Sequence, residues 1–391
     1  MKNCAKCELT DEESPQNFFG HIFMCTKKIM VMNMSKFRLF DAIRCLRDTV
    51  ESKDFLSFAR KTATAFTRLR KMSFCDMIYF IISAKRRCVQ HELDEFFKQK
   101  GTERMSRQAF AKAREKIKPE AIRTINEGLI SNFEKHDQEI RTIHGLRVFA
   151  FDGSLIDLPE NEKLRRTFGF TSGSGNITHC KARAMTGMDL LNGVCVYGEL
   201  IPLSVGETTN MHDEILDYFA DIEIYKNCIF VLDRAYPSFK LFKKLEKNEQ
   251  FYLMRATKSF YKEIVSASEP DQIVTIKKKK ETAEVRVLKF PLVSGEIEIL
   301  VTNLPEIFTY DELVSLYAKR WGIETNYHYM KNVELLECFT GESVTAVLQD
   351  FYAGILMLNI AAIAYREQAD IWQRTALKNL KNTIINLTKS K

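Results

Sequence analysis

A change of hydrophobic pattern near residue 145 divides this 391-residue sequence into two parts. Between residues 35 and about 140, apolar residues recur at steps of three and four, which predicts helices, and Pro119 is the only proline. After residue 145, short apolar segments typical of buried strands alternate with helical patterns. The sequence therefore predicts an α/β protein that follows a region made of helices alone.

Two of the predicted buried strands lead into an aspartate. The segment LRVFAFDGS (146–154) contains Asp152, and NCIFVLDRAYPS (227–238) contains Asp233. Carboxylates at the ends of neighbouring strands suit Mg²⁺, because this hard cation prefers oxygen donors. Taken singly, an aspartate after a strand is more often a turn or capping residue.

The segment YAKRWGIETNYHYMK (317–331) has a helical pattern. At about 100° per residue, Tyr317, Arg320, Glu324 and Lys331 fall within an arc of roughly 60°. An alternative is that Arg320 and Glu324 form only an i,i+4 ion pair on a solvated face, which contributes little stability.

Together these residues resemble a known family. The pattern Y-x2-R-x3-E-x6-K, preceded by D-G-S and D-R-A-Y on strands, is similar to the signature of DDE transposases of bacterial insertion sequences, in the group called insertion sequence family four. The resemblance covers roughly residues 146–365. It implies an RNase H-like catalytic core in which Asp152, Asp233 and Glu324 match the DDE triad and hold the metal.

The resemblance also implies a function. Family members cut DNA at the ends of the mobile element and join those ends to target DNA, with two Mg²⁺ ions, for which Mn²⁺ substitutes. It implies that Tyr317, Arg320 and Lys331 hold DNA phosphates, and that the β-rich stretch 257–305 is the family's insertion domain. The expected partners are the double-stranded terminal inverted repeats, the target DNA and a second subunit.

Family members can form a DNA hairpin on the way, and the sequence departs from the family pattern at the residue that supports this step. Better-known members stack an insertion-domain tryptophan on a flipped base, whereas the two tryptophans here, Trp321 and Trp372, lie outside 257–305. Any aromatic face can stack on a base. Phe260, Tyr261 and Phe290 are therefore candidates, although a role in the core of the β-rich region is the alternative for each.

The N-terminal part carries the positive charge. Residues 1–145 hold 28 Lys and Arg against 19 Asp and Glu, a balance of +9 within a total of +7. The segment 89–119 predicts two helices with a turn at Gly101, the second beginning after Ser106. A DNA-binding helix-turn-helix and a plain αα-hairpin fit this pattern equally well. The candidate DNA contacts are Arg104, Arg107, Lys112, Arg114, Lys116 and Lys118.

Cys4, Cys7, His21 and Cys25 have a spacing that fits zinc, C-x2-C-x13-H-x3-C. Against a zinc site, the segment lies outside the family core and alternative start positions follow it. The remaining cysteines are scattered, which favours reduced thiols in a cytoplasm. The resemblance implies a bacterial cytoplasm, with the protein associated with the nucleoid. The apolar run 351–365 is short for a bilayer and contains Asn359, so it predicts a buried helix and no membrane role.

These observations predict a Mg²⁺-dependent DNA transposase. The alternative is a domesticated descendant that binds DNA without cutting it. The expected organisation is an uncertain N-terminal extension (1–34), a helical DNA-binding region (35–143), the first part of the RNase H-like core (144–256), the β-rich insertion (257–305), and the second part of the core with C-terminal helices (306–391).

Overall fold

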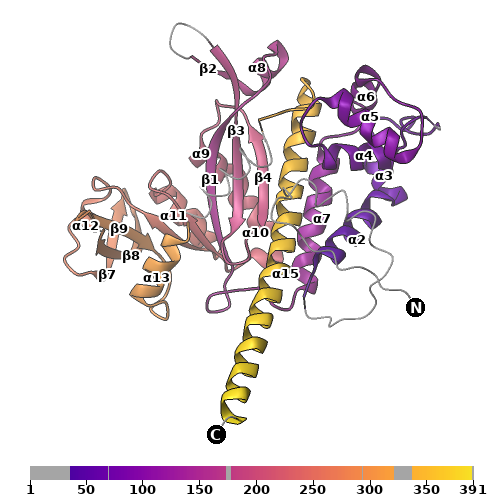
Figure 1. Cartoon of the computed structure of the whole chain (residues 1–391). Helices are drawn as coiled ribbons and strands as arrows, with labels where there is room; N and C mark the ends of the chain where they lie inside the picture. The colour runs from indigo at the N-terminus through magenta and orange to yellow at the C-terminus, as the bar shows by residue number, and fades with distance from the viewer. Residues whose placement is uncertain (1–35, 69, 173–177, 293, 321–336, 390–391) are drawn as a thin grey trace.

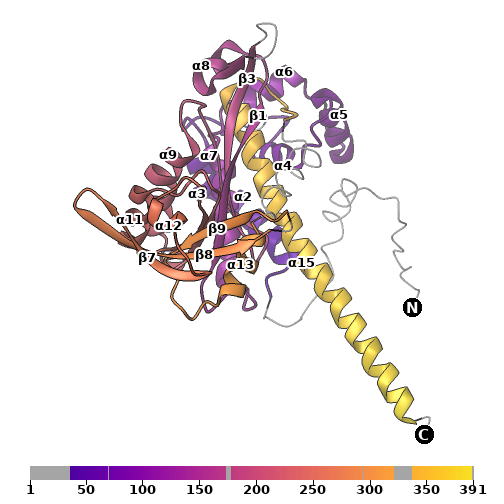
Figure 2. The same cartoon turned by 90° about the vertical axis from the view of Figure 1, so that its left-hand side faces the viewer.

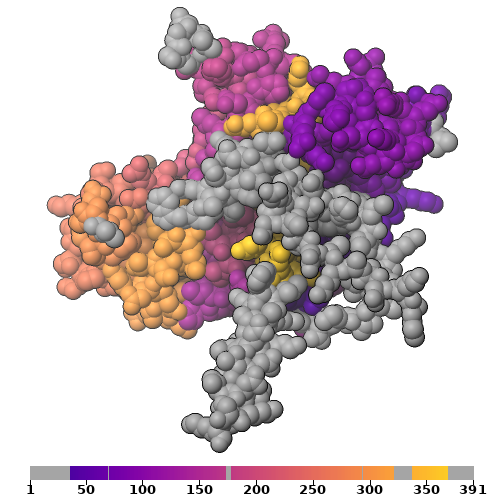
Figure 3. All heavy atoms as spheres, viewed as in Figure 1, coloured from indigo at the N-terminus to yellow at the C-terminus, as the bar shows by residue number. Residues whose placement is uncertain are grey.

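The computed structural model describes residues 36–389 apart from 69, 173–177, 293 and 321–336, with side chains up to residue 368. Figure 1 shows a group of N-terminal helices on one side of a set of central strands, and β7, β8 and β9 on the opposite side. The same two ends are visible on the surface in Figure 3, in indigo to purple and in orange.

Helices fill most of the first hundred described residues. Ser52, Ser73 and Ser106 each begin a helix by accepting a hydrogen bond from a backbone N–H in its first turn. Gly101 ends α5 at a φ of 66°, the left-handed conformation that glycine adopts without a Cβ penalty. The helices are α2 (Leu39–Val50), α3 (Lys53–Ala59), α4 (Phe74–Ser83), α5 (Val89–Lys100), α6 (Arg107–Arg114) and α7 (Glu120–His136).

A mixed nine-stranded sheet forms the centre of the molecule, in the order β2-β3-β1-β5-β6-β9-β8-β7, with β4 also paired to β3. β1 is antiparallel to β3 and parallel to β5, and β5 is parallel to β6. The strands are β1 (Val148–Asp157), β2 (Phe170–Ser172), β3 (Thr178–Asp189), β4 (Cys195–Ile201), β5 (Ile229–Leu232), β6 (Phe251–Arg255), β7 (Asp271–Lys278), β8 (Glu281–Pro291) and β9 (Ile297–Thr302).

The β-rich stretch expected as an insertion is joined to the core sheet. β9 pairs antiparallel with β6, from Leu253 opposite Thr302 to Arg255 opposite Leu300. β8 and β7 then extend the sheet outward. The stretch therefore continues the central sheet through backbone hydrogen bonds, which places its strands at a fixed position relative to β5 and β6.

Further helices cover the sheet. They are α8 (Glu162–Phe168), α9 (Glu207–Asn210), which continues through a π-helical turn (Met211–Ile215) into α10 (Leu216–Asp221), a 3₁₀ turn (Glu223–Tyr225), α11 (Phe239–Lys247), α12 (Lys262–Val265), α13 (Tyr310–Ala318) and α15 (Val344–Lys389). α15 packs against α7, α4, α2 and β4, and Figure 2 shows its C-terminal part leaving the body of the molecule.

Residues 344–368 of α15 are long and apolar enough to cross a membrane, but 78% of the apolar window is buried inside the protein. Asn359, within this helix, accepts a hydrogen bond from the backbone N–H of Cys195 at 2.6 Å and donates to the side chain of Asn126 at 2.8 Å. The apolar run is thus a core helix of the fold, as its sequence predicted. All cysteines among the described residues are free thiols.

Candidate active site

Asp152 lies on β1, and Asp233 directly follows the parallel strand β5. In the β1–β5 register Ala150 is opposite Val231, so each aspartate follows its paired residue by two positions. Because side chains alternate along a strand and neighbouring strands lie about 4.8 Å apart, the two carboxylates belong to the same level and face of the sheet. Two segments separated by 80 residues of sequence thus deliver paired acids.

The two strands end differently. β5 ends at Leu232, directly before Asp233, as the sequence predicted. The expectation that the first strand ends at Asp152 is wrong, because β1 continues to Asp157 by pairing with β3. Asp152 instead lies within β1, two residues beyond Ala150, which is the last β1 residue paired with β5. From there to Asp157, β1 continues as the partner of β3.

Burial and neighbouring charges perturb Asp152. Burial raises the pKa of its carboxyl to about 6, while a backbone hydrogen bond from Gly153 opposes this change. The charges of Glu207 and Asp233 raise the pKa further, and that of Arg320 lowers it. The Asp233 carboxylate accepts a hydrogen bond from the backbone N–H of Arg234 at 2.6 Å. Ionisation of Asp152 is therefore less favourable in the fold than in water.

Tyr317 and Arg320 come from α13 and the turn after it. The helix begins with a capping box formed by Thr309 and Glu312. It ends at Ala318, where the N–H of Arg320 donates to the carbonyl of Tyr317 at 2.9 Å. The expectation of one continuous helix through 317–331 is therefore wrong at 319–320, because i→i−3 bonds of this kind close the last turn.

The side chains of Tyr317 and Arg320 lie inside the protein, with 5% and 3% of their surfaces exposed. The guanidinium carbon of Arg320 is 5.7 Å from the centre of the Tyr317 ring. Burial raises the pKa of Tyr317, and the charges of Arg320 and Asp233 lower and raise it respectively. Both residues are therefore within electrostatic reach of the paired aspartates.

Two ion pairs near this group were not expected from the sequence. Arg183 pairs with Glu207, which lies so close to Gly153 that a Cβ there would be 2.6 Å from the carboxyl carbon. Arg255 pairs with the buried Glu298 at 2.5 Å across β6 and β9. The sequence carried no signal for either, because the first pair joins β3 to α9 and the second joins β6 to β9, and only the tertiary fold brings these elements together.

Part of the expected site lies outside the described residues. Glu324, Lys331 and Trp321 are there, and so are Cys4, Cys7, His21 and Cys25 of the possible zinc site. Within the described residues no three His, Cys, Asp or Glu side chains could hold a metal ion together. The carboxylate oxygens of Asp152 and Asp233 are the donor type that Mg²⁺ prefers.

The basic residues of the N-terminal helices divide into two groups. Arg104, Arg107 and Lys112 are exposed, as a DNA contact requires. Arg114 is only 1% exposed, and its guanidinium donates to the Asp350 carboxylate at 2.8 Å. The expectation that Arg114 contacts DNA is therefore wrong. The buried ion pair with Asp350 neutralises its charge and joins α6 to α15.

The aromatic candidates for base stacking are partly buried. Phe260 packs edge-on against Tyr261, with ring centres 5.0 Å apart, and against Phe242 at 6.1 Å. Phe290, in β8, is also half-buried. These contacts favour a packing role for Phe260 and Tyr261. Trp372 lies in α15, in the part whose side chains are outside the description.

Two hollows accompany the site. One, of about 260 Å³, lies beside the loop that follows Asp233; the backbone N–H of Tyr236 in this loop donates to the carbonyl of Asp233 at 3.1 Å. Its lining carries four hydroxyl-bearing side chains, and its one lysine, Lys240, lies 3.9 Å from the Asp213 carboxylate, which also lines it. The lining residues are Thr208, Thr209, His212, Asp213, Tyr236, Ser238, Lys240 and Leu241.

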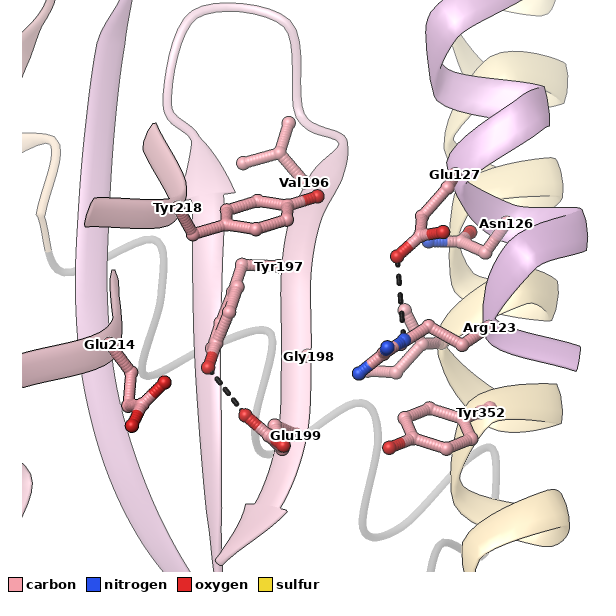
Figure 4. A pocket seen from close by; sticks show the side chains of 11 residues that line it. Arg123, Asn126, Glu127, Val196, Tyr197, Gly198, Glu199, Glu214, Tyr218 and Tyr352 are labelled. Atoms are coloured by element: carbon pink, nitrogen blue, oxygen red, sulfur yellow. Dashed lines mark hydrogen bonds and ion pairs between the residues drawn. The ribbon is translucent and has the colours of Figure 1, made fainter. Parts of the chain in front are cut away.

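The other hollow, of about 190 Å³, lies between α7, β4, α10 and α15. Figure 4 shows Arg123 paired with Glu127 and the Tyr197 hydroxyl donating to Glu199 at 2.7 Å. Glu214 adds a third carboxylate against the single arginine. A phosphate would be repelled here, so this hollow is unsuited to a DNA backbone.

Comparisons with known proteins give one family match. The family described as "Transposase DDE domain" matches residues 143–360, which include both aspartates. Among solved structures, the chain is similar to the piggyBac transposase in a synaptic complex with hairpin DNA, with a TM-score of 0.48 and 14% identity over 83% of this chain and 75% of the other. No curated protein matches the sequence.

Proposed function

Because the chain belongs to the transposase DDE domain family, we propose that it is a Mg²⁺-dependent enzyme of the insertion sequence family four group. In this proposal it cuts DNA at the ends of a mobile element and transfers the cut strand into target DNA. The observation that carries the proposal is the placement of Asp152 and Asp233 at one level of two parallel strands. The RNase H-like assignment of the core rests on the same two strands.

The two aspartates fit a divalent cation. Their oxygens are hard donors, and burial, with smaller contributions from the charges of Glu207 and Asp233, raises the pKa of Asp152 and so makes its ionisation costly. A shared cation removes that cost. Glu324 is proposed as the third ligand, and the pair of metal ions, when bound, activates the attacking oxygen and stabilises the leaving oxygen in phosphoryl transfer.

The protein's own residues position the DNA. We assign Arg320 to a phosphate beside the aspartates, because its charge acts on Asp152 and its guanidinium lies over the Tyr317 ring. Arg320 is only 3% exposed, so this role requires that its side chain become accessible when DNA binds. Lys331 and the Tyr317 hydroxyl are proposed to hold neighbouring phosphates. The same arrangement serves cleavage by water, hairpin formation and strand transfer by a 3′-hydroxyl, because only the nucleophile differs.

DNA recognition is proposed for the N-terminal helices, residues 35–143. The exposed cations Arg104, Arg107 and Lys112 project from α6 and the segment before it. Phosphate neutralisation by such cations releases counterions, so binding weakens steeply with salt. We further propose that a homodimer holds two element ends together and that the protein works on DNA in the bacterial cytoplasm.

The proposal is tested with the purified chain and the genomic DNA that flanks its gene. We expect Mg²⁺-dependent strand cuts at the element's ends, mapped at nucleotide resolution. The matched control is Asp233→Asn, which keeps the size of the side chain and should bind the same DNA without cutting. Binding without any cut by the wild-type chain would instead identify a domesticated DNA-binding protein.

A further inference from the structure

Four consecutive lysines form the tip of the β7–β8 hairpin. The ladder runs from Asp271 opposite Leu288 to Lys278 opposite Glu281, which leaves Lys279 and Lys280 as a two-residue turn. All four side chains are exposed. We call Lys277, Lys278, Lys279 and Lys280 the lysine tip.

The charges of the lysine tip are not neutralised by the protein. Within the described part of the chain none of the four lysines takes part in an ion pair, although Glu281 follows directly. Other exposed lysines do have partners: Lys226 pairs with Glu223 at 2.6 Å and Lys258 with Glu296 at 3.2 Å. The tip is therefore a concentrated positive charge open to an external anion.

The backbone conformation of the Lys279–Lys280 turn disfavours a lysine at its first position. Lys279 has a φ of 56°, whereas Lys280 does not have a positive φ. In two-residue hairpin turns whose first central residue has positive φ, glycine is preferred at that position, because a Cβ is strained there. A lysine in place of glycine suggests that its charge has a use outside the fold.

Protection of the sheet edge is the alternative explanation, because lysines on edge strands prevent pairing with other chains. β7 is the last strand of the sheet, so Lys277 and Lys278 could serve in this way. Lys279 and Lys280 lie in the turn and present no strand edge. Edge protection therefore does not account for half of the lysine tip.

We propose that the lysine tip is a DNA-backbone contact separate from the N-terminal helices, and this inference rests on the proposed function. In Figure 1 β7 lies on the opposite side of β1 and β3 from those helices. Five strand steps separate β7 from β1, roughly 24 Å at about 4.8 Å per step. At about 3.4 Å per base pair, the contact falls about seven base pairs or more from the cut.

The test measures DNA affinity of the full chain as a function of salt. Lys279→Gly removes one charge while it gives the turn its preferred residue, so the fold should be as stable as wild type or more so. Lys279→Gly with Lys280→Gln removes two charges. The matched control is Lys226→Gln with Lys243→Gln, two lysines paired with Glu223 and Glu246 on the surface.

Each lost phosphate contact should lower the slope of log K against log salt by about 0.9 and the affinity at physiological salt by about fivefold. The tip double variant should therefore lose about two units of slope, and the control pair less than half a unit. The difference in salt slope between the tip double variant and wild type should vanish on duplexes that extend about five base pairs from the cut. It should return on duplexes that extend about twenty base pairs, since only these reach the lysine tip. The cutting rate at saturating DNA should not change.

The outcomes separate this inference from the proposed function. If the wild-type chain binds and cuts DNA but the tip variants keep its salt slope, the inference is overturned and the proposed function stands. If the variants keep the slope and sediment as aggregates, the turn lysines serve solubility and the inference is overturned. If the wild-type chain does not bind duplex DNA at all, both fall.

Discussion

Arg114→Met should destabilise the protein strongly, whereas Lys112→Met on the same helix should not. Arg114 is buried and donates to the side chains of Gln349 and Thr340 as well as to Asp350, which is itself 1% exposed. Removal of the arginine therefore leaves a buried carboxylate without its cation.

The size of the stability loss in Arg114→Met depends on the hydrogen bonds that Asp350 retains. Breaking a buried ion pair by removing one partner costs about 3–5 kcal/mol. Asp350 still accepts from the backbone N–H of Thr340 at 2.7 Å and from its hydroxyl, which places the loss near the lower end, about 3 kcal/mol. Asp350→Asn, added to Arg114→Met, removes the stranded charge and should recover about 2 kcal/mol of it.

Urea unfolding followed by circular dichroism measures these differences, with DNA binding measured on the folded proteins. Lys112→Met should change the free energy of unfolding by less than about 0.5 kcal/mol, because its side chain is exposed, but should weaken DNA binding. If Arg114→Met unfolds like wild type and loses DNA affinity as Lys112→Met does, Arg114 is a DNA contact after all and its assignment to the α6–α15 junction is refuted.

Three further changes test the site and its support. Because burial raises the pKa of Asp152 from 3.8 to about 6, the metal-free fold loses stability as the pH rises from about 3.8 to about 6, and above that the loss is constant. Asp152→Asn should therefore be more stable than wild type by up to about 3 kcal/mol at pH 8 and no different at pH 4. The same difference between variant and wild type at both pH values in urea unfolding would contradict this. Gly187→Ala places a Cβ 2.3 Å from the Phe151 ring and should cost about 1–3 kcal/mol in the same assay, while an unchanged midpoint would show that β3 shifts freely. Arg320→Ala should weaken cleavage and the complex with the element's end at an unchanged Mg²⁺ requirement, and cleavage at the wild-type level would leave Arg320 a packing residue.

Local patterns in the sequence predicted the elements that depend on neighbouring residues. Ser106 begins its helix and Gly101 ends the one before, because capping and left-handed glycine are properties of a few adjacent positions. The end of β5 at Leu232, directly before Asp233, was equally visible, since a buried strand stops where the apolar run stops.

Features set by distant partners could not be predicted in this way. In the sequence Arg114 cannot be told apart from its exposed basic neighbours. Only the packing of α15 against α6 shows that Asp350 neutralises its charge. The continuation of β1 beyond Asp152 depends on β3, and the pairing of β9 with β6 depends on residues almost fifty positions apart. The spacing of Asp152 and Asp233 suggested a shared site, but the β1–β5 register was needed to place them at one level.

The central claim is that Asp152, Asp233 and Glu324 hold the metal for DNA cutting. The most direct measurement maps cleavage of a duplex that carries the element's end by wild type, Asp152→Asn, Asp233→Asn and Glu324→Gln, with Mg²⁺, Mn²⁺ or Ca²⁺, alongside a gel shift for binding. We predict that each variant binds and loses cleavage by orders of magnitude, because each change removes a negative charge that holds the ions. Wild type should cut with Mg²⁺ or Mn²⁺ and bind without cutting in Ca²⁺, whose longer bonds position the reacting oxygens poorly. A folded Asp233→Asn or Glu324→Gln protein that cuts at the wild-type rate would contradict the claim.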